Sequence, residues 1–420
     1  MKADAFIGNN EIVQIIQNLK QEGIHQKEFS DVTDGIHQYV DLVMEGGGVL
    51  GIALAGYVHV LEEMNIRFLQ LGGTSAGAIN TMLMAASGPI HEAKTGWILE
   101  QICNKNFYDF VDGDKDAKKF IEAVLQDAGK LQMALKGVQV IDNLNNDLGL
   151  NPGNEFKSWI KQLLHSKGIV SLKDLQTLRK TGPPTGLYNK INKEVKYGPE
   201  AYERIVIVSA DVTTESKIIF PEMAELFWSE PENINPAEFV RATMSIPFFF
   251  FPYRVKSIPQ GTIANEKWKK HTGFEGVIPT EVAFVDGGIM SNFPIDIFHE
   301  HRKIPESPTF GVKLGVDRSE TKKTDKIFSF IGAMFDSARH VHDYNYLFKN
   351  PDFKKLICVI NIGHHNWLNF NINDQDKIDL FVRGAKDAAK FLREFNWPQY
   401  KELRKGTVIM HNTLNKDSIT

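Results

Sequence analysis

Two glycine-rich turns, each placed between an apolar run and a segment with helical periodicity, constrain this fold more than any other feature of the sequence. The first turn, EGGGVLG at 45–51, follows the apolar run at 39–44. The second, GGTSAG at 72–77, follows a similar run at 66–71, and the helical pattern at 52–64 lies between them. Connections this short join parallel strands through a crossover helix. We therefore expect an α/β fold whose functional groups lie at the carboxyl ends of its strands.

The rest of the chain extends this pattern. An amphipathic helix is predicted over 374–395, where it closes the sheet. We predict a three-layer α/β/α sandwich with a mostly parallel central sheet. Further strands are predicted at 204–212, 217–220, 281–285, 309–314 and 356–360.

We divide the chain into three parts on these patterns. Residues 1–37 form a short helical lead-in, 38–396 form the main domain, and 397–420 form a C-terminal tail without a clear signal. Within the main domain, residues from about 89 to 200 are polar and mostly helical in pattern. We interpret them as a helical insertion that caps one face of the sheet.

Composition excludes several classes of protein. The formal net charge is −4 and the lysines form no basic stripe, which argues against a nucleic-acid partner. Cys103 and Cys358 are the only cysteines and lack ligand spacing, so a reducing, cytoplasmic setting is the simpler expectation. The first residues predict no secretory signal, and no stretch reaches the ~18 apolar residues of a membrane-spanning helix. Contact with lipid is therefore expected only peripherally, at a membrane surface.

GGTSAG places Ser75 where a nucleophile could act. The sequence matches G-x-S-x-G at a predicted strand-to-helix turn, and a serine there has its hydroxyl lifted clear of the sheet. The glycines are needed because the turn is strained and a neighbouring β-carbon would clash. The structural alternative is that Thr74 and Ser75 only cap a helix.

EGGGVLG can be interpreted in two ways. Gly46, Gly48 and Gly51 satisfy the G-x-G-x-x-G pattern of dinucleotide-binding folds. That pattern expects an acidic residue near the end of the next strand, where 71–73 read Leu-Gly-Gly. The amides of Gly46, Gly47 and Gly48 would instead suit a developing oxyanion at a helix N-terminus. Since 75 − 48 = 27 residues separate the two turns on successive strands, we expect them to share one crevice.

FVDGGIM, at 284–290, supplies a carboxylate at the end of a third apolar run. By itself this is an ordinary strand-to-turn signal. Combined with a serine at a sharp turn, Asp286 becomes the base that a serine nucleophile needs.

Two other kinds of site have to be considered. Asp286 followed by His364 would copy the order of an α/β-hydrolase triad, although such folds separate the two glycine turns further. DGDKD at 112–116 copies the first calcium-loop ligands but has Ala117 and Ala123 where the turn glycine and the bidentate glutamate belong. We predict a solvated helix start there and no metal. The histidines that follow Ser75 are interpreted as surface or core residues; they include His299, His301, His340, His342, His364 and His365.

GGGVLG, GTSAG and DGG, in this order, resemble the three signature blocks of the patatin-like phospholipases. The segments YERIVIVSADVTTESKIIF, PAEFVRATMSIPFFFFPY and SNFPI also resemble the family, so the similarity runs from about residue 40 to about 395. The resemblance implies a catalytic domain at 38–396 that hydrolyses fatty-acyl esters of phospholipids or other lipids. It implies transient contact with a membrane surface, leaves room for an unidentified activator, and implies no cofactor or metal.

The resemblance also assigns roles to residues. Ser75 would be the nucleophile and Asp286 its base, without a histidine, and the intermediate would be an acyl-enzyme. The oxyanion hole would consist of the amides of Gly46, Gly47, Gly48 and Ala76. The motif glycines that support these groups would be Gly51, Gly73, Gly77, Gly287 and Gly288.

One position departs from the family pattern. The family usually has Arg or Lys before the last glycine of the first block, and this chain has Leu50. A basic side chain there would add positive potential near an oxyanion. The departure leaves open a second class of function, a catalytically inactive lipid-binding or signalling module, beside the active hydrolase that the glycine and Ala76 amides favour.

Overall fold

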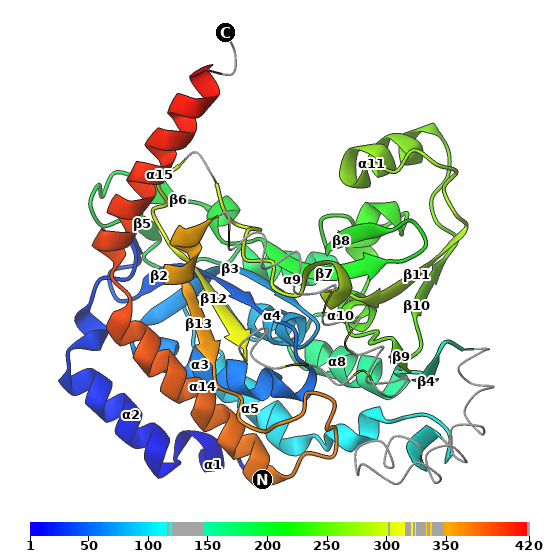
Figure 1. The fold of residues 1–420 in the computed structure, drawn as a ribbon, viewed down its shortest axis with the longest axis horizontal. Coiled ribbons are helices and arrows are strands. Elements are labelled where there is room, and N and C mark those ends of the chain that lie inside the picture. Colours follow the sequence, from blue (N-terminus) through cyan, green and yellow to red (C-terminus); the bar gives the residue numbers. More distant parts are fainter. Residues whose placement is uncertain are drawn as a thin grey trace.

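A mixed sheet with a parallel centre organises the protein (Figure 1). The computed structural model describes residues 1–115, 117–119, 147–300, 303–315 and 350–417, and single positions at 321, 324, 333, 337 and 348. Eleven strands of this part form the main sheet, and its five central strands run parallel in the order β13-β12-β2-β3-β7. They span β2 (Gln38–Met44), β3 (Ile66–Thr74), β7 (Ile205–Asp211), β12 (Thr309–Leu314) and β13 (Ile357–Ile360).

Antiparallel strands flank this centre. β11 (Glu281–Asp286) and β8 (Ser216–Phe220) both pair antiparallel with β7, and β10 (Tyr253–Lys256) pairs antiparallel with β11. On the other side of the parallel centre, the sheet continues from β2 to β1 (Val32–Thr33), then β5 (Leu187–Asn189) and β6 (Lys196–Tyr197). The predicted mostly parallel sheet is therefore confirmed at its centre.

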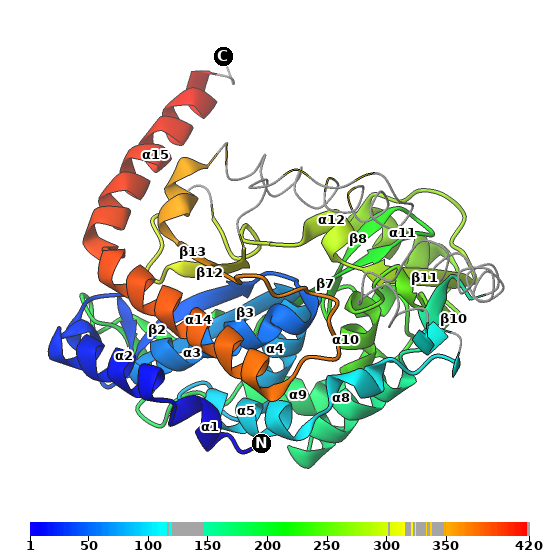
Figure 2. The same cartoon turned by 60° about the horizontal axis from the view of Figure 1, so that its bottom comes forward.

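Helices cover the sheet as the α/β pattern predicts. Figure 2 shows α3 (Gly51–Glu63), α4 (Ala76–Ala86) and α14 (Asp374–Glu394) on one face, with α12 (Gly288–Ser291) on the opposite face. α3 is apolar nearly all round because α14 covers its outer side. The two helices approach very closely at glycines, since a β-carbon on Gly384 would lie 1.9 Å from the Ala53 carbonyl oxygen.

The predicted insertion contributes helices beside this layer. Its described parts contain α5 (Thr95–Asn104), a 3-10 turn (Phe107–Phe110), β4 (Gly149–Asn151), α8 (Asn154–Ser166) and α9 (Leu172–Arg179). Residues 120–146 of the predicted cap lie outside the described residues. β4 pairs with β9 (Phe248–Phe250) in a separate two-stranded sheet, which connects the insertion to the segment before β10.

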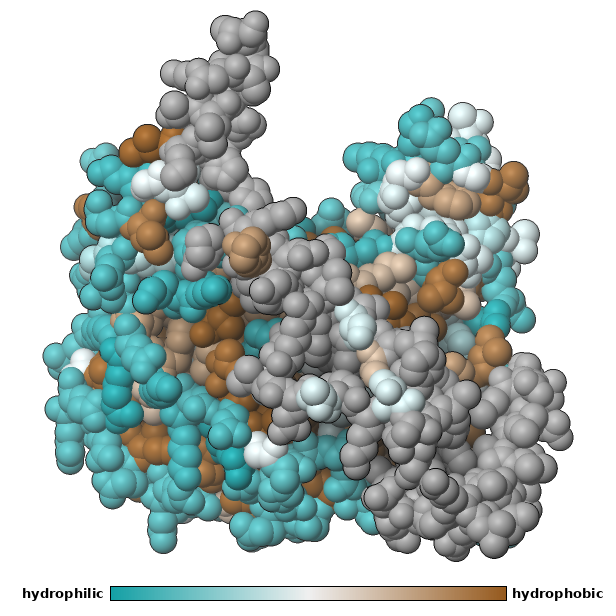
Figure 3. Space-filling model, viewed as in Figure 1, coloured by the Kyte–Doolittle hydropathy of each residue, from teal (hydrophilic) through white to brown (hydrophobic). Residues whose placement is uncertain are grey.

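The two ends of the chain are helical. The lead-in forms α1 (Asp4–Ile7) and α2 (Asn10–Gln21), and the Phe6 ring packs edge-on against Phe381 of α14 at 5.3 Å between centroids. The described part of the predicted tail is α15 (Trp397–Asp417), which extends away from the body in Figure 1. Hydrophilic side chains cover much of the described surface in Figure 3, with apolar ones in scattered patches between them. None of the described helices combines the length and apolar character needed to cross a bilayer.

Candidate active site

Ser75 lies at a strained turn between β3 and α4. Its φ of 51° and ψ of −121° are unusual for a residue with a side chain, and such strain persists only where the surroundings enforce it. Thr243, at the end of α10 (Ala237–Thr243), provides that enforcement. Its hydroxyl accepts a hydrogen bond from the Ser75 amide at 3.0 Å and donates one to the Val208 carbonyl on β7. The turn therefore holds the Ser75 side chain away from the sheet ladder.

Within the part of the chain that the structure describes, the hydrogen bond of the Ser75 hydroxyl is weak. The hydroxyl donates to the Met244 sulfur at 3.4 Å, and a thioether is a poor acceptor. Ser75 is 4% exposed. A hydroxyl held so loosely in a buried position can turn toward a stronger base at small cost.

The glycines around Ser75 permit close approach of the elements. A β-carbon on Gly77 would lie 2.1 Å from the carbonyl oxygen of Met44, and one on Gly73 would lie 2.5 Å from the backbone of Gly77. The start of α4 thus rests directly on the ends of β2 and β3. Any larger residue would push the helix, and with it Ser75, away from the sheet.

Asp286 lies on an antiparallel strand, close to the level of the sheet at which Ser75 follows β3. In β11 it pairs with Ser209 of β7, while on the other side of β7 the last residue of β3, Thr74, pairs with Val208. Ser75, the next residue after β3, therefore follows near the level of Ser209, with β7 between it and Asp286. Two strand spacings of about 4.8 Å separate their backbones by roughly 10 Å. The Asp286 carboxylate accepts the Gly288 amide at 2.7 Å, and its own amide donates to Ser245.

The first glycine turn lies against Ser75. A β-carbon on Gly46 would lie 3.0 Å from the Ser75 β-carbon. The Gly46 amide donates to the carbonyl of Asn292 at 3.2 Å, and the Asn292 side chain donates back to the Gly46 carbonyl at 3.3 Å. Sequence reasoning did not select Asn292, whose only signal was its place in SNFPI, six residues after Asp286. Asn292 connects the glycine turn to the segment that carries Asp286.

Gly48 has a conformation and a contact that exclude other residues. Its φ is +55°, and a β-carbon there would lie 2.1 Å from the carbonyl oxygen of Trp367. The same oxygen accepts the Val49 amide at 3.0 Å. Trp367 lies on the loop after β13, so this loop helps to hold the glycine turn in place. Leu50, the departure from the family pattern, is 3% exposed and packs in the core.

A buried ion pair fixes the residue that precedes the glycines. The Lys313 ammonium lies 2.9 Å from one Glu45 carboxylate oxygen, and the Leu314 amide donates to the other at 2.6 Å. Both side chains are 5% exposed or less. The Leu314 side chain also occupies the space beside Gly47 that a β-carbon would need. This pair was not apparent from the sequence, because a lone Glu and Lys 268 residues apart carry no local signal.

An apolar cavity opens beside Ser75. Gly48, Ala76 and Met244 line it near the serine. Aromatic side chains line the rest: Phe107, Phe110, Phe156, Trp159 and Phe370. Four of these five come from the described parts of the predicted cap insertion. The lining suits an apolar chain, with few polar groups except near the serine.

The residues of the rejected alternatives have other contacts. Glu62, an acidic residue on the helix between the two glycine turns, accepts the amides of Lys94 and Thr95 at the start of α5. Asp112 accepts the Gly153 amide at 2.9 Å at the start of α8. The imidazole of His365 pairs with Asp379 at 2.8 Å. Three histidines considered for a triad, His301, His340 and His342, lie outside the described residues.

Comparison with known proteins identifies the family. Residues 42–299 match the family described as patatin-like phospholipase, which is more than half of the chain. The chain belongs to this family. This assignment confirms the resemblance that the glycine and aspartate blocks indicated. The general chemistry of the family is lipid hydrolysis.

Individual relatives are more distant. The chain is 29% identical over 363 residues to the uncharacterized protein YqhO of Bacillus subtilis (strain 168), covering 86% of this chain and all of the relative. It is 24% identical over 261 residues to the uncharacterized protein L620 of Acanthamoeba polyphaga mimivirus, covering 60% of this chain and 61% of that one.

Two solved structures are similar only in a general way. VipD from Legionella pneumophila has a TM-score of 0.42 at 14% identity, over 88% of this chain and 70% of that one. The ExoU–SpcU complex from the type III secretion system of Pseudomonas aeruginosa has a TM-score of 0.33 at 15% identity, over 85% of this chain and 52% of that one.

Proposed function

We propose that this patatin-like protein hydrolyses fatty-acyl esters of phospholipids or related lipids through a Ser75–Asp286 dyad. The observation that carries the proposal is the register of the sheet, in which Asp286 pairs with Ser209 and Thr74, the residue before Ser75, pairs with Val208. The strained turn at Ser75 and the adjacent apolar cavity support it. The proposal covers a catalytic unit at 38–396, with 1–37 as a helical lead-in and 397–420 as a tail.

The first step would form an acyl-enzyme. Ser75 Oγ turns from Met244 toward Asp286, which takes the hydroxyl proton as Oγ attacks the ester carbonyl carbon. The carbonyl oxygen becomes an oxyanion. When the tetrahedral intermediate collapses, the bond to the alcohol oxygen breaks and the proton on Asp286 passes to that oxygen. Water, deprotonated by the same carboxylate, then attacks the acyl-enzyme, releasing the fatty acid and restoring the Ser75 hydroxyl.

Backbone amides would stabilise the oxyanion. The Gly46 amide donates to Asn292, so the proposal relies chiefly on Gly47, Gly48 and the Ala76 amide at the start of α4. The first amides of a helix lack intrahelical acceptors and lie at the positive end of its dipole. Because none of these donors depends on residue 50, activity does not require a basic side chain there.

A carboxylate is a weak base, so the rate would depend on orientation and on the oxyanion donors. The ordinary pKa of an aspartate is near ~3.9, far below that of a serine hydroxyl. Preorganised amides in a site that excludes water contribute about 10²–10³-fold each in comparable enzymes. The rigid glycine turn, held by Asn292 on one side and Trp367 on the other, supports this mechanism.

The cavity would accept the acyl chain. With the acyl chain packed against the aromatic side chains from the cap, the ester would lie next to Ser75 and the headgroup would face solvent. We therefore propose a cytoplasmic enzyme that contacts a membrane surface transiently to take up its substrate. An unidentified activator that alters the cap would fit this arrangement.

Fatty-acid release from phosphatidylcholine vesicles, followed by mass spectrometry, tests the proposal. Ser75→Ala and Asp286→Asn should each reduce release by at least about 100-fold while the circular dichroism spectrum stays that of the wild type. Ser87→Ala, a serine hydroxyl at the opposite end of α4, is the matched control and should retain full activity. Retention of most activity by Asp286→Asn would refute the dyad in favour of a histidine base. No release by the wild type from any ester would favour the inactive lipid-binding module.

A further inference from the structure

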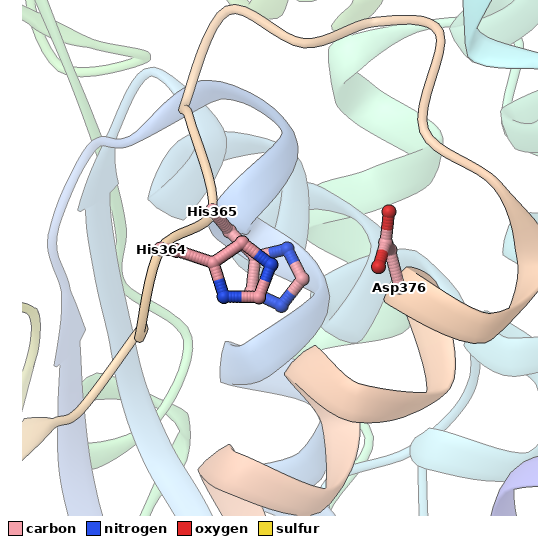
Figure 4. Close-up of side chains that lie close together, drawn as sticks. All are labelled: His364, His365 and Asp376. Atoms are coloured by element: carbon pink, nitrogen blue, oxygen red, sulfur yellow. The ribbon is translucent and has the colours of Figure 1, made fainter.

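The loop between β13 and α14 gathers three side chains that could bind a metal ion (Figure 4). His364 and His365 lie on this loop, and Asp376 lies in the first turn of α14. One ligand atom from each residue lies within 4.8 Å of the other two. Figure 4 shows the two imidazole rings one behind the other, with the Asp376 carboxylate facing them across a gap. His364 is exposed and the other two are half-buried, so the group is open to solvent.

A second carboxylate orients one of these imidazoles. Asp379 Oδ2 lies 2.8 Å from His365 Nε2 and 2.6 Å from Arg383 Nε. With the Nε2 proton donated to Asp379, His365 Nδ1 is left as the basic nitrogen. Metal-binding histidines commonly have a carboxylate on the nitrogen that does not bind the ion.

The Asp376 carboxylate also keeps an oxygen available. Its Oδ2 accepts the Asn373 side-chain amide at 2.9 Å, and its backbone amide donates to the same side chain. The cap at the start of α14 therefore orients Asp376 through Oδ2, and no described residue donates a hydrogen bond to Oδ1. The positive charge of Arg383 is offset by its ion pair with Asp379.

We propose that His364, His365 and Asp376 bind a divalent transition-metal ion of the Zn²⁺ type. Two imidazoles and one carboxylate suit Zn²⁺, Ni²⁺ or Cu²⁺, whereas Ca²⁺ and Mg²⁺ prefer sites made of oxygen atoms. Tetrahedral bonds of about 2.0–2.1 Å place ligand atoms roughly 3.4 Å apart, so the group must contract slightly on binding. The exposed His364 ring can provide that movement through a change of rotamer. Three protein ligands leave a fourth position for water.

The position of the loop gives such a site a consequence beyond binding. The Trp367 carbonyl, two residues after His365, accepts the Val49 amide beside the glycine turn. Phe370, on the same loop, lines the apolar cavity. A metal ion bound between the loop and α14 would hold in place the segment that supports Gly48 and forms one cavity wall. Binding itself does not depend on the proposed ester hydrolysis.

Isothermal titration with ZnCl₂ in a non-chelating buffer tests the site. The full-length wild type should bind one Zn²⁺ per chain at this site. His364→Ala and Asp376→Asn should each weaken that binding by about tenfold or more, because each removes a ligand. His165→Ala removes an exposed histidine of α8 and is the matched control, with the affinity of the wild type. Equal affinity in all four proteins, or no stoichiometric binding by the wild type, would overturn the proposal.

Asp379 has a separate test as a positioning residue. Asp379→Asn should weaken Zn²⁺ binding by ~10–100-fold while keeping the stoichiometry of one, because the ligands remain but His365 loses its orientation. The Zn²⁺-dependent rise in melting temperature provides a readout independent of activity, and the metal-free melting temperature reports any loss of folding. Ca²⁺ in place of Zn²⁺ should give no rise. A rise with Ca²⁺ equal to that with Zn²⁺ would contradict the assignment of the ligand class.

Discussion

Thr243→Val is the most informative test of how the fold enforces the turn at Ser75. The substitution keeps the approximate shape of a fully buried side chain and replaces its hydroxyl with a methyl group. That hydroxyl accepts the Ser75 amide at 3.0 Å and donates to the Val208 carbonyl. The valine therefore leaves a buried amide without its acceptor at the residue proposed as nucleophile.

The expected loss of stability follows from that contact. An unsatisfied buried donor costs about 1–3 kcal/mol, and we expect the free energy of unfolding to fall by this amount. The φ of +51° at Ser75 stores further strain, and the loss of its support lets the backbone relax away from the active geometry. A shift of the nucleophile by ~1 Å can reduce the rate about 100-fold. Activity should therefore fall even under conditions where the variant is fully folded.

Urea unfolding followed by circular dichroism, together with ester hydrolysis, measures both effects. Thr243→Ser is the matched control, because it keeps the hydroxyl and loses one methyl group, worth about 0.8 kcal/mol. The serine variant should keep most of the activity and the valine variant should not. A valine variant as stable and as active as the wild type would refute the role assigned to Thr243.

Three further predictions concern the surroundings of the site. Gly77→Ala should destabilise the protein by about 1–3 kcal/mol in urea unfolding, because its β-carbon would lie 2.1 Å from the backbone of β2; Gly96→Ala, on the exposed side of α5 with open space around it, should not. Lys313→Met should cost ~3–5 kcal/mol in the same assay by leaving Glu45 buried without its partner, and an unchanged midpoint would contradict the pairing. Burial raises the pKa of Asp41 to about 7, so the folded state binds more protons than the unfolded state between about pH 4 and 7. Wild-type stability should accordingly fall as pH rises through that range relative to Asp41→Asn, and parallel pH profiles of the two proteins would refute this.

The parallel centre of the sheet was predictable because its signals are local. Each central strand is a short apolar run followed by a glycine turn or a polar break, and a crossover helix as short as α3 leaves only a parallel arrangement. The direction of β11 was not predictable. Its pairing with β7 depends on contacts across more than 70 residues, which no local pattern encodes. The residue of β7 with which Asp286 pairs could therefore be identified only from the structure.

The same distinction holds within the site. Ser75 and Gly48 carry local signals, since a strained turn and a positive φ require particular residue types in the sequence itself. Thr243, Asn292 and Lys313 act through hydrogen bonds or an ion pair to residues 168, 246 and 268 positions away. A threonine, asparagine or lysine alone is too common to reveal such a partner.

Reaction with a fluorophosphonate probe, followed by peptide mass spectrometry, tests the central claim most directly. We predict a single phosphonyl adduct on Ser75, because only a hydroxyl with an adjacent base and oxyanion donors reacts quickly with the probe. Asp286→Asn should slow the labelling by roughly 100-fold or more without unfolding the chain. An adduct on a different serine, or labelling of Asp286→Asn at the wild-type rate, would contradict the dyad.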